Sequence, residues 1–126
     1  MRCFSYVDDV VKALVACLKP SVAGMTFNIG SDARYTINEL SEALYRVTGI
    51  NTPPEYVADR PQEVKEAVSD HTEAKKHLGY KDETSLKIGL EATWLWMKEK
   101  GPQEPVYDEL EIPSDKIPVT WKERKI

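Results

Sequence analysis

The feature that most constrains the fold of this chain is a segment near its amino-terminal end that is apolar on nearly every side. Between residues 10 and 18, valines and leucines recur at helical spacing, and small residues between them leave little polar surface. Asp8 or Asp9 can cap a helix here and Pro20 stops it, so the pattern predicts a helix over about residues 8–19. A helix of this kind requires burial on most of its sides.

Two strands and three more helices are predicted, which together indicate an α/β fold class. Aromatic and β-branched residues favour short strands over residues 2–7 and 25–29. Thr36, with Glu39 three residues on, forms a capping box that begins the clearest amphipathic helix of the chain. Gly49 ends that helix.

The two remaining helices follow the same kind of signal. Asp70, with Glu73 three residues on, predicts a capping box for a short helix that closes at Gly79. Thr84 or Ser85 begins the last helix, whose apolar residues again recur at helical spacing.

Proline and charge dominate the sequence after Gly101. The four prolines and many charged residues there predict an extended tail without regular structure over residues 101–126. The chain is therefore expected to divide into one folded segment, residues 1–100, and this tail.

Composition places the chain among soluble globular proteins and excludes several functional classes. Of its 126 residues, 41% are hydrophobic and 30% are charged. A net charge of -4 without a basic stripe argues against a nucleic-acid partner. No apolar run is long enough to cross a bilayer and no leader opens the chain, so we expect no membrane contact. Cys3 and Cys17 make no disulfide framework, which favours a reduced, cytoplasmic setting.

The residues by themselves reveal no catalytic set. The serines lack the context of a nucleophile, and the glycines form no phosphate-cradling loop. Asp8 and Asp9 could form an acid/base pair, but carboxylates at a helix start more often cap it and face its dipole. We expect no metal site at His71 and His77, because a spacing of six residues puts them on different faces of a helix.

The most distinctive polar stretch is the charged turn over residues 58–70. Pro61 fixes its own backbone angle and pushes Arg60 towards extended backbone, which holds the guanidinium in a loop. Taken alone, such a stretch is most often only solvated surface. Arg2 also lies at the edge of a predicted strand, and two arginines that converge suit a diphosphate. Spacing in sequence does not show that they converge.

Five parts of the sequence carry recognisable motifs in a fixed order. They are Arg-Cys-Phe-Ser-Tyr-Val-Asp-Asp at 2–9, Phe-Asn-Ile-Gly with Thr-Ile-Asn-Glu-Leu at 27–40, Arg-Pro-Gln-Glu-Val at 60–64, Ser-Asp with Ala-Lys-Lys-His-Leu-Gly-Tyr at 69–80, and Ser-Leu-Lys-Ile-Gly-Leu at 85–90. Together they resemble the carboxy-terminal part of the extended short-chain dehydrogenase/reductases, which include the NAD-dependent nucleotide-sugar epimerases and dehydratases. The resemblance, which is to the UDP-glucose 4-epimerase type, covers about residues 2–100.

This resemblance implies a substrate-binding role for three residues. In the family, the arginines at the positions of Arg2 and Arg60 contact the diphosphate of the nucleotide sugar. The acid at the position of Glu63 reaches the ribose. This chain has Gln62 where the family usually has glycine, and Glu63 where it has aspartate. None of the three residues would be catalytic.

The resemblance also implies what the chain lacks. In the family, a glycine-rich cofactor loop and a Tyr-x-x-x-Lys catalytic pair precede this region, and neither motif occurs here. The implied structure is therefore the substrate-binding portion of a Rossmann-type enzyme without its dinucleotide-binding domain. NAD would act in the intact enzyme, with a UDP-sugar as the expected substrate. This chain alone is expected to bind no cofactor and to be inactive.

The apolar helix over residues 8–19 gains a specific meaning from this resemblance. In the full fold it would pack against the dinucleotide-binding sheet, and monomers rarely leave a large apolar patch exposed. We therefore expect a homo-oligomer that forms through this helix. Two alternatives remain open: a stand-alone nucleotide-binding or anion-binding module, and an interaction subunit that docks a partner carrying the Rossmann half.

Overall fold

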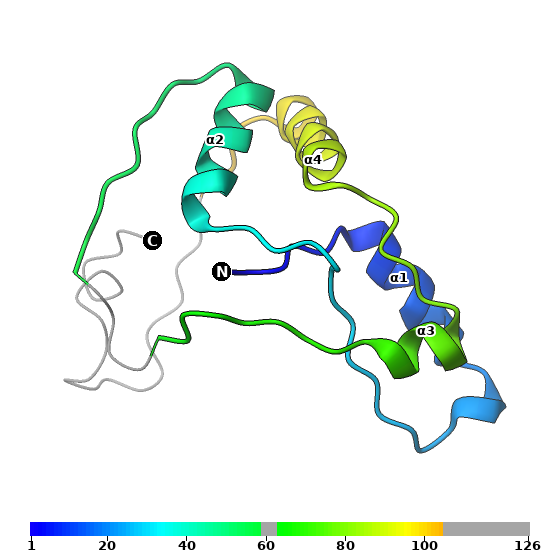
Figure 1. The fold of residues 1–126 in the computed structure, drawn as a ribbon. Helices are drawn as coiled ribbons and strands as arrows, with labels where there is room; N and C mark the ends of the chain where they lie inside the picture. Colours follow the sequence, from blue (N-terminus) through cyan, green and yellow to red (C-terminus); the bar gives the residue numbers. More distant parts are fainter. Residues whose placement is uncertain (59–62, 105–126) are drawn as a thin grey trace.

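The computed structural model of the protein describes residues 1–58 and 63–104. The regular structure of this part is helical, and Figure 1 shows its elements. They are α1 (Val7–Ala16), the short 3₁₀ helix η1 (Pro20–Val22), α2 (Ile37–Thr48), α3 (Thr72–Leu78) and α4 (Leu86–Lys100). All four predicted helices are thus confirmed. The predicted tail falls largely on residues outside the described part, so the division at residue 100 stays a prediction.

The predicted strands over residues 2–7 and 25–29 are wrong for the part of the chain that the structure describes. Only isolated bridges occur there, and both involve Arg2, which pairs antiparallel with Tyr35 and parallel with Ala67. A strand needs a neighbour that pairs with several of its residues. The second segment makes no main-chain hydrogen bond to any described segment distant in sequence. The described part is therefore helical, and the strand half of the expected α/β class is not seen in it.

Helix α1 begins without the aspartate cap that its sequence predicts. Tyr6 occupies the N-cap position and no side chain caps the helix, while Asp8 and Asp9 lie in its first turn. The prediction fails because the Asp9 carboxylate is used elsewhere, as the acceptor for the main-chain N–H of Thr84 at 2.9 Å. After Ala16, single hydrogen-bonded turns carry the chain on to η1.

Helices α2 and α4 begin as their sequences predict, and α2 also ends as predicted. The Thr36 side chain accepts from the main-chain N–H of Glu39, whose carboxylate accepts in return from the main-chain N–H of Thr36, so the capping box is complete. Gly49 then ends α2 with a positive φ of 73°. Ser85 caps α4 by accepting from Ile88, and a glycine with positive φ follows the last helical residue.

Helix α3 is begun by a different residue from the one expected. His71 takes the N-cap position with no side-chain cap, so the predicted box of Asp70 and Glu73 is wrong. The Asp70 carboxylate still binds locally, because it accepts from the main-chain N–H of Thr72 at 2.9 Å and from its hydroxyl at 2.7 Å. Gly79 closes the helix in the left-handed conformation, as predicted.

The helices pack as two pairs, α1 with α3 and α2 with α4, and Figure 1 shows extended segments connecting the pairs. The buried apolar residues gather at the first pair. Among the described residues this core consists of Ala13, Ala16, Val22, Ala74, Leu78 and Tyr80, with Phe27 and Ile29 packed against it. Most of these side chains are small, so the interior is too small to cover the apolar surface of all the helices.

Helix α1 leaves large apolar side chains exposed. The sequence predicts that this helix is buried on most of its sides, and this prediction is wrong within the described part of the chain. Of the residues of α1, only Asp9, Ala13 and Ala16 are buried. Five large apolar side chains of α1 and the turn after it are exposed; they are Val7, Val11, Leu14, Val15 and Leu18. We call these five residues the α1 apolar face.

The expectations about membrane contact and about the cysteines can be compared with the structure. In the part of the chain that is described, no helix is both long and apolar enough to span a bilayer. Both cysteines are free thiols, Cys3 half-buried and Cys17 exposed. A cytoplasmic location stays a prediction.

A candidate anion-binding site around Arg2

Arg2 is held by its main chain between two distant segments. Its N–H donates to the carbonyl of Tyr35 at 2.8 Å, and its carbonyl accepts from the Tyr35 N–H at 2.9 Å. On the other side, the Ala67 N–H donates to the carbonyl of Met1 at 3.2 Å. Arg2 is therefore the central residue where three extended segments meet.

The guanidinium of Arg2 is oriented by main-chain carbonyls. Its Nη1 donates to the carbonyls of Met1 at 3.0 Å and Lys65 at 3.3 Å. Its Nη2 lies 3.5 Å from Oε1 of Glu63 in an ion pair whose side chains are 30% and 39% exposed. Neutral carbonyls orient the group without cancelling its charge, so one edge of the fork can still meet an anion.

The structure brings together two of the three site residues implied by the sequence. Arg2 and Glu63 are in contact although 61 residues separate them in the chain. Arg60 lies outside the described residues, so its convergence with Arg2 stays a prediction. Sequence reasoning missed Tyr35 and Lys65, which act through main-chain atoms and therefore leave no signal in residue type.

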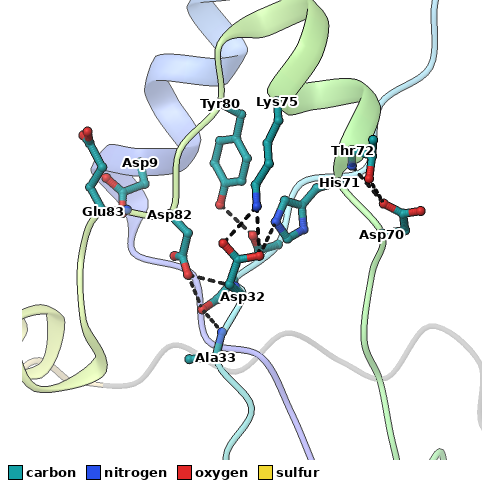
Figure 2. A network of polar contacts seen from close by, with 12 residues as sticks. Asp9, Asp32, Ala33, Asp70, His71, Thr72, Lys75, Tyr80, Asp82 and Glu83 are labelled. Carbon is teal, nitrogen blue, oxygen red and sulfur yellow. Dashed lines mark hydrogen bonds and ion pairs between the residues drawn. The ribbon is translucent and has the colours of Figure 1, made fainter.

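A cluster of polar side chains, shown in Figure 2, connects the segment before Tyr35 to helix α3. Oδ1 of Asp32 lies 2.9 Å from His71 Nε2, and Lys75 Nζ lies 3.0 Å from each carboxylate oxygen of Asp32. Lys75, with a smaller contribution from His71, holds the pKa of Asp32 below its usual 3.8. We call Asp32, His71 and Lys75 the polar clamp.

The loop after Tyr80 is bound to the same segment. Asp82 Oδ2 accepts from the Ser31 hydroxyl at 2.7 Å and from the Asp32 N–H at 2.8 Å, and Tyr80 donates its hydroxyl to the Gly30 carbonyl at 2.8 Å. Together with the polar clamp, these bonds place the residues that lead into Tyr35. They thereby fix the segment that holds the main chain of Arg2.

The buried carboxylate of Asp9 connects α1 to the residues just before α4. Asp9 is 1% exposed, and its Oδ2 accepts the main-chain N–H groups of Glu83 at 3.2 Å and Thr84 at 2.9 Å. Burial by itself raises the pKa of Asp9, but the hydrogen bonds from Thr84 and Lys12 outweigh it and hold that pKa below 3.8. Asp9 is thus a structural link, and its carboxylate is not paired with Asp8 for acid/base chemistry.

A polar cavity of about 210 Å³ lies beside the polar clamp. Its walls include the clamp residues together with Arg34, Ser69 and Asp70. Within the described part, His71 Nδ1 and Asp82 Oδ1 are buried without a hydrogen-bond partner. Among the described residues that line this cavity, no hydrogen bond joins a serine hydroxyl to the histidine that could act as its base.

Comparison with known proteins identifies relatives of this chain. A UDP-glucuronate 4-epimerase from Thermodesulfobacterium geofontis is 34% identical over 99 residues, which are 78% of this chain and 30% of that protein. The structure of UDP-glucose 4-epimerase from Thermotoga maritima with UDP-glucose is 32% identical, with a TM-score of 0.70 over 78% of this chain and 31% of that one. No protein-family model matches the chain.

A second solved structure is similar to this chain over the same share of its length. It is a mutant UDP-glucuronic acid 4-epimerase from Bacillus cereus with UDP-4-deoxy-4-fluoro-glucuronic acid and NAD, 29% identical, with a TM-score of 0.71 over 78% of this chain and 32% of that one. The chain corresponds to the carboxy-terminal part of an extended short-chain dehydrogenase/reductase. It spans about a third of the length of these relatives. The family predicted from five sequence motifs is thereby confirmed.

The extended short-chain dehydrogenase/reductases use NAD, and the residues described here do not fit that cofactor. A dinucleotide needs a glycine-rich turn that opens a helix, so that main-chain N–H groups can meet the pyrophosphate. The described helices begin instead at Tyr6, Thr36, His71 and Ser85, none of which follows such a turn. That no cofactor binds this chain alone stays a prediction.

Proposed function

We propose that this chain supplies nucleotide-sugar binding residues of an NAD-dependent nucleotide-sugar epimerase or dehydratase. The observation that carries the proposal is the setting of Arg2. Its main chain pairs with that of Tyr35, the carbonyl of the preceding Met1 accepts from Ala67, its Nη1 is oriented by two carbonyls, and its side chain is still 30% exposed. A cation positioned in this way can meet a phosphate oxygen with little loss of side-chain freedom.

Three residues have roles in the proposed site. Arg2 and Arg60 contact the diphosphate, and Glu63 reaches the ribose. The contact between Glu63 and Arg2 supports this assignment, because the acid lies beside the guanidinium that is proposed to meet the diphosphate. A UDP-sugar is the proposed substrate, in line with the names of the relatives that bind UDP-glucose and a UDP-linked glucuronic acid analogue.

Redox chemistry lies outside this chain in the proposal. NAD would supply hydride transfer in the intact enzyme, bound by a part of the fold that these residues do not form. The residues of this chain bind and orient the substrate, and none of them is catalytic. The chain alone is therefore proposed to be inactive.

Titration of the full chain with UDP, by calorimetry or ligand-observed NMR, tests the proposal. An arginine–phosphate contact is worth about 1.5–3 kcal/mol, so Arg2→Ala should weaken UDP binding by about 10- to 100-fold. Arg46→Ala is the matched control, because Arg46 lies on α2 and pairs with Glu42. Equal UDP affinity in the Arg2→Ala variant and the parent chain would show that the assignment is wrong.

A second proposal concerns association, and the α1 apolar face favours it. Leu14 and Val15 are 59% and 62% exposed, although the segment is apolar on most sides. We propose that a second copy of the chain covers this face. The alternative is a partner that carries the Rossmann half, in which case the chain is an interaction subunit.

Light scattering at micromolar concentration tests association. Leu14→Lys should convert the oligomer to monomer, whereas Ile37→Lys on α2, where the side chain is similarly exposed at 61%, should leave the mass unchanged. A parent chain that is already monomeric contradicts the second-copy proposal and favours the partner. If the isolated chain binds UDP with micromolar affinity and shows no turnover, a stand-alone binding module is favoured; a chain that supplies only part of a site, as in the first proposal, binds UDP more weakly than this.

A further inference from the structure

The ion pair between Arg2 and Glu63 is the longest of the hydrogen-bonding contacts described for Arg2. The single Nη2–Oε1 distance is 3.5 Å, at the long end for a hydrogen bond, and both side chains are about one-third exposed. Exposed ion pairs of this kind contribute little, because water and salt screen them. At Arg2 Nη2, a stronger anion therefore has only this weak contact to replace.

The other partners of Arg2 do not compete for its charge. Met1 and Lys65 offer only carbonyl oxygens, and both bind Nη1. The Glu63 carboxylate meets the other terminal nitrogen, Nη2. An anion that approaches Nη2 therefore arrives at the position where a carboxylate already lies, while the carbonyl contacts can stay in place.

We propose that Glu63 is a displaceable counterion: it occupies the anion position on Arg2 in the empty site and yields it to a phosphate group. This inference rests on the proposed function of Arg2 as a diphosphate contact. It adds that Glu63 limits the affinity of the site for a bare anion. The same side chain is then released towards the sugar side of a bound nucleotide.

The inference makes opposite predictions for two ligands. Inorganic pyrophosphate has no ribose, so it meets only the competition from Glu63. UDP meets the same competition but also gains whatever contact Glu63 makes with the ribose. Removing the charge of Glu63 should therefore favour pyrophosphate more than UDP.

The test measures pyrophosphate and UDP binding to the full chain at low ionic strength for Glu63→Gln, which keeps the length of the side chain and removes its charge. Pyrophosphate binding should tighten by about two- to fivefold, the factor that exposed ion pairs of this kind provide. The gain for UDP should be smaller, or become a loss. Glu66→Gln is the control for net charge, because Glu66 is exposed and lies three residues further on; it should produce less than half of the gain.

A double-mutant cycle ties the effect to Arg2. With Arg2→Ala as the background, Glu63→Gln should no longer change pyrophosphate affinity. Suppose that Glu63→Gln leaves pyrophosphate binding unchanged or weaker, while Arg2→Ala weakens it. The inference that Glu63 is a displaceable counterion is then wrong, and the proposed function stands. If Arg2→Ala itself has no effect, the proposed function fails. A gain that persists without Arg2 also overturns the inference.

Discussion

Replacing Asp9 should uncouple α1 from the start of α4. The carboxylate is 1% exposed and accepts two main-chain N–H groups, those of Glu83 and Thr84. A hydrogen bond to a charged group contributes about 1.5–3 kcal/mol, and Asp9→Ala leaves both N–H groups without that acceptor. The expected cost is about 3 kcal/mol, the low end for two bonds. Asp9→Asn keeps one acceptor oxygen and should lose roughly half as much.

Urea unfolding followed by helical circular dichroism measures this cost. With a slope of about 1.5 kcal/mol per molar urea, Asp9→Ala should lower the midpoint by roughly 2 M. Asp8→Ala is the matched control, because Asp8 lies in the same helical turn but is exposed, and it should change stability by no more than about 0.5 kcal/mol. Equal midpoints for the two alanine variants would refute the assignment of Asp9 as a structural link.

The pH dependence gives an independent reading of the same residue. Because hydrogen bonds hold the folded-state pKa of Asp9 below 3.8, its contribution to stability is present above about pH 3.8. It is lost as the pH falls below that value and through the folded-state pKa. The stability difference between the parent chain and Asp9→Asn should therefore narrow below pH 3.8. A difference that stays constant down to pH 2 would contradict the argument.

Three further substitutions test local features. Thr36→Ala removes the capping box with Glu39 and should cost about 1 kcal/mol in urea unfolding, with no loss contradicting the cap. Gly49→Ala should cost about 1 kcal/mol by the same assay, because its φ of 73° strains an L side chain although the space around it is open. Asp32→Asn should reduce the drop in urea midpoint between pH 7 and pH 3, because Lys75 stabilises the charged Asp32 carboxylate above pH 3.8 and protonation removes that contribution below it. An unchanged drop in Asp32→Asn would show that the pair does not matter.

The features that the sequence predicted well are those decided within one helical turn. The box of Thr36 and Glu39 and the stop at Gly49 depend only on neighbouring residues, and both occur as expected. Local patterns become ambiguous where a polar side chain has more than one available partner. Asp9 and Asp70 both looked like caps, yet Asp9 binds the loop before α4 and Asp70 binds Thr72 from outside the helix.

The features that the sequence could not predict depend on distant main-chain atoms. The residue types at 25–29 are compatible with a strand, but a strand also requires a paired neighbour, which the described residues do not provide. The prediction that Arg2 and Glu63 belong to one site came from a family resemblance, since spacing alone cannot bring together residues 61 positions apart, and their direct contact was not predicted. The carbonyl of Lys65, which helps to orient Arg2, leaves no trace in residue type.

The central position of Arg2 has a consequence for the order in which the protein is made and folds. Its side-chain partners lie 61 and 63 residues further along the chain, and closing loops of that length costs entropy before any contact forms. Synthesis begins at the amino-terminal end, so Arg2 leaves the ribosome long before Lys65 or Ala67 exists. Arg2 can therefore reach its native contacts only after about sixty further residues have been made. A residue that is synthesised early in this segment is among the last to become part of a binding site.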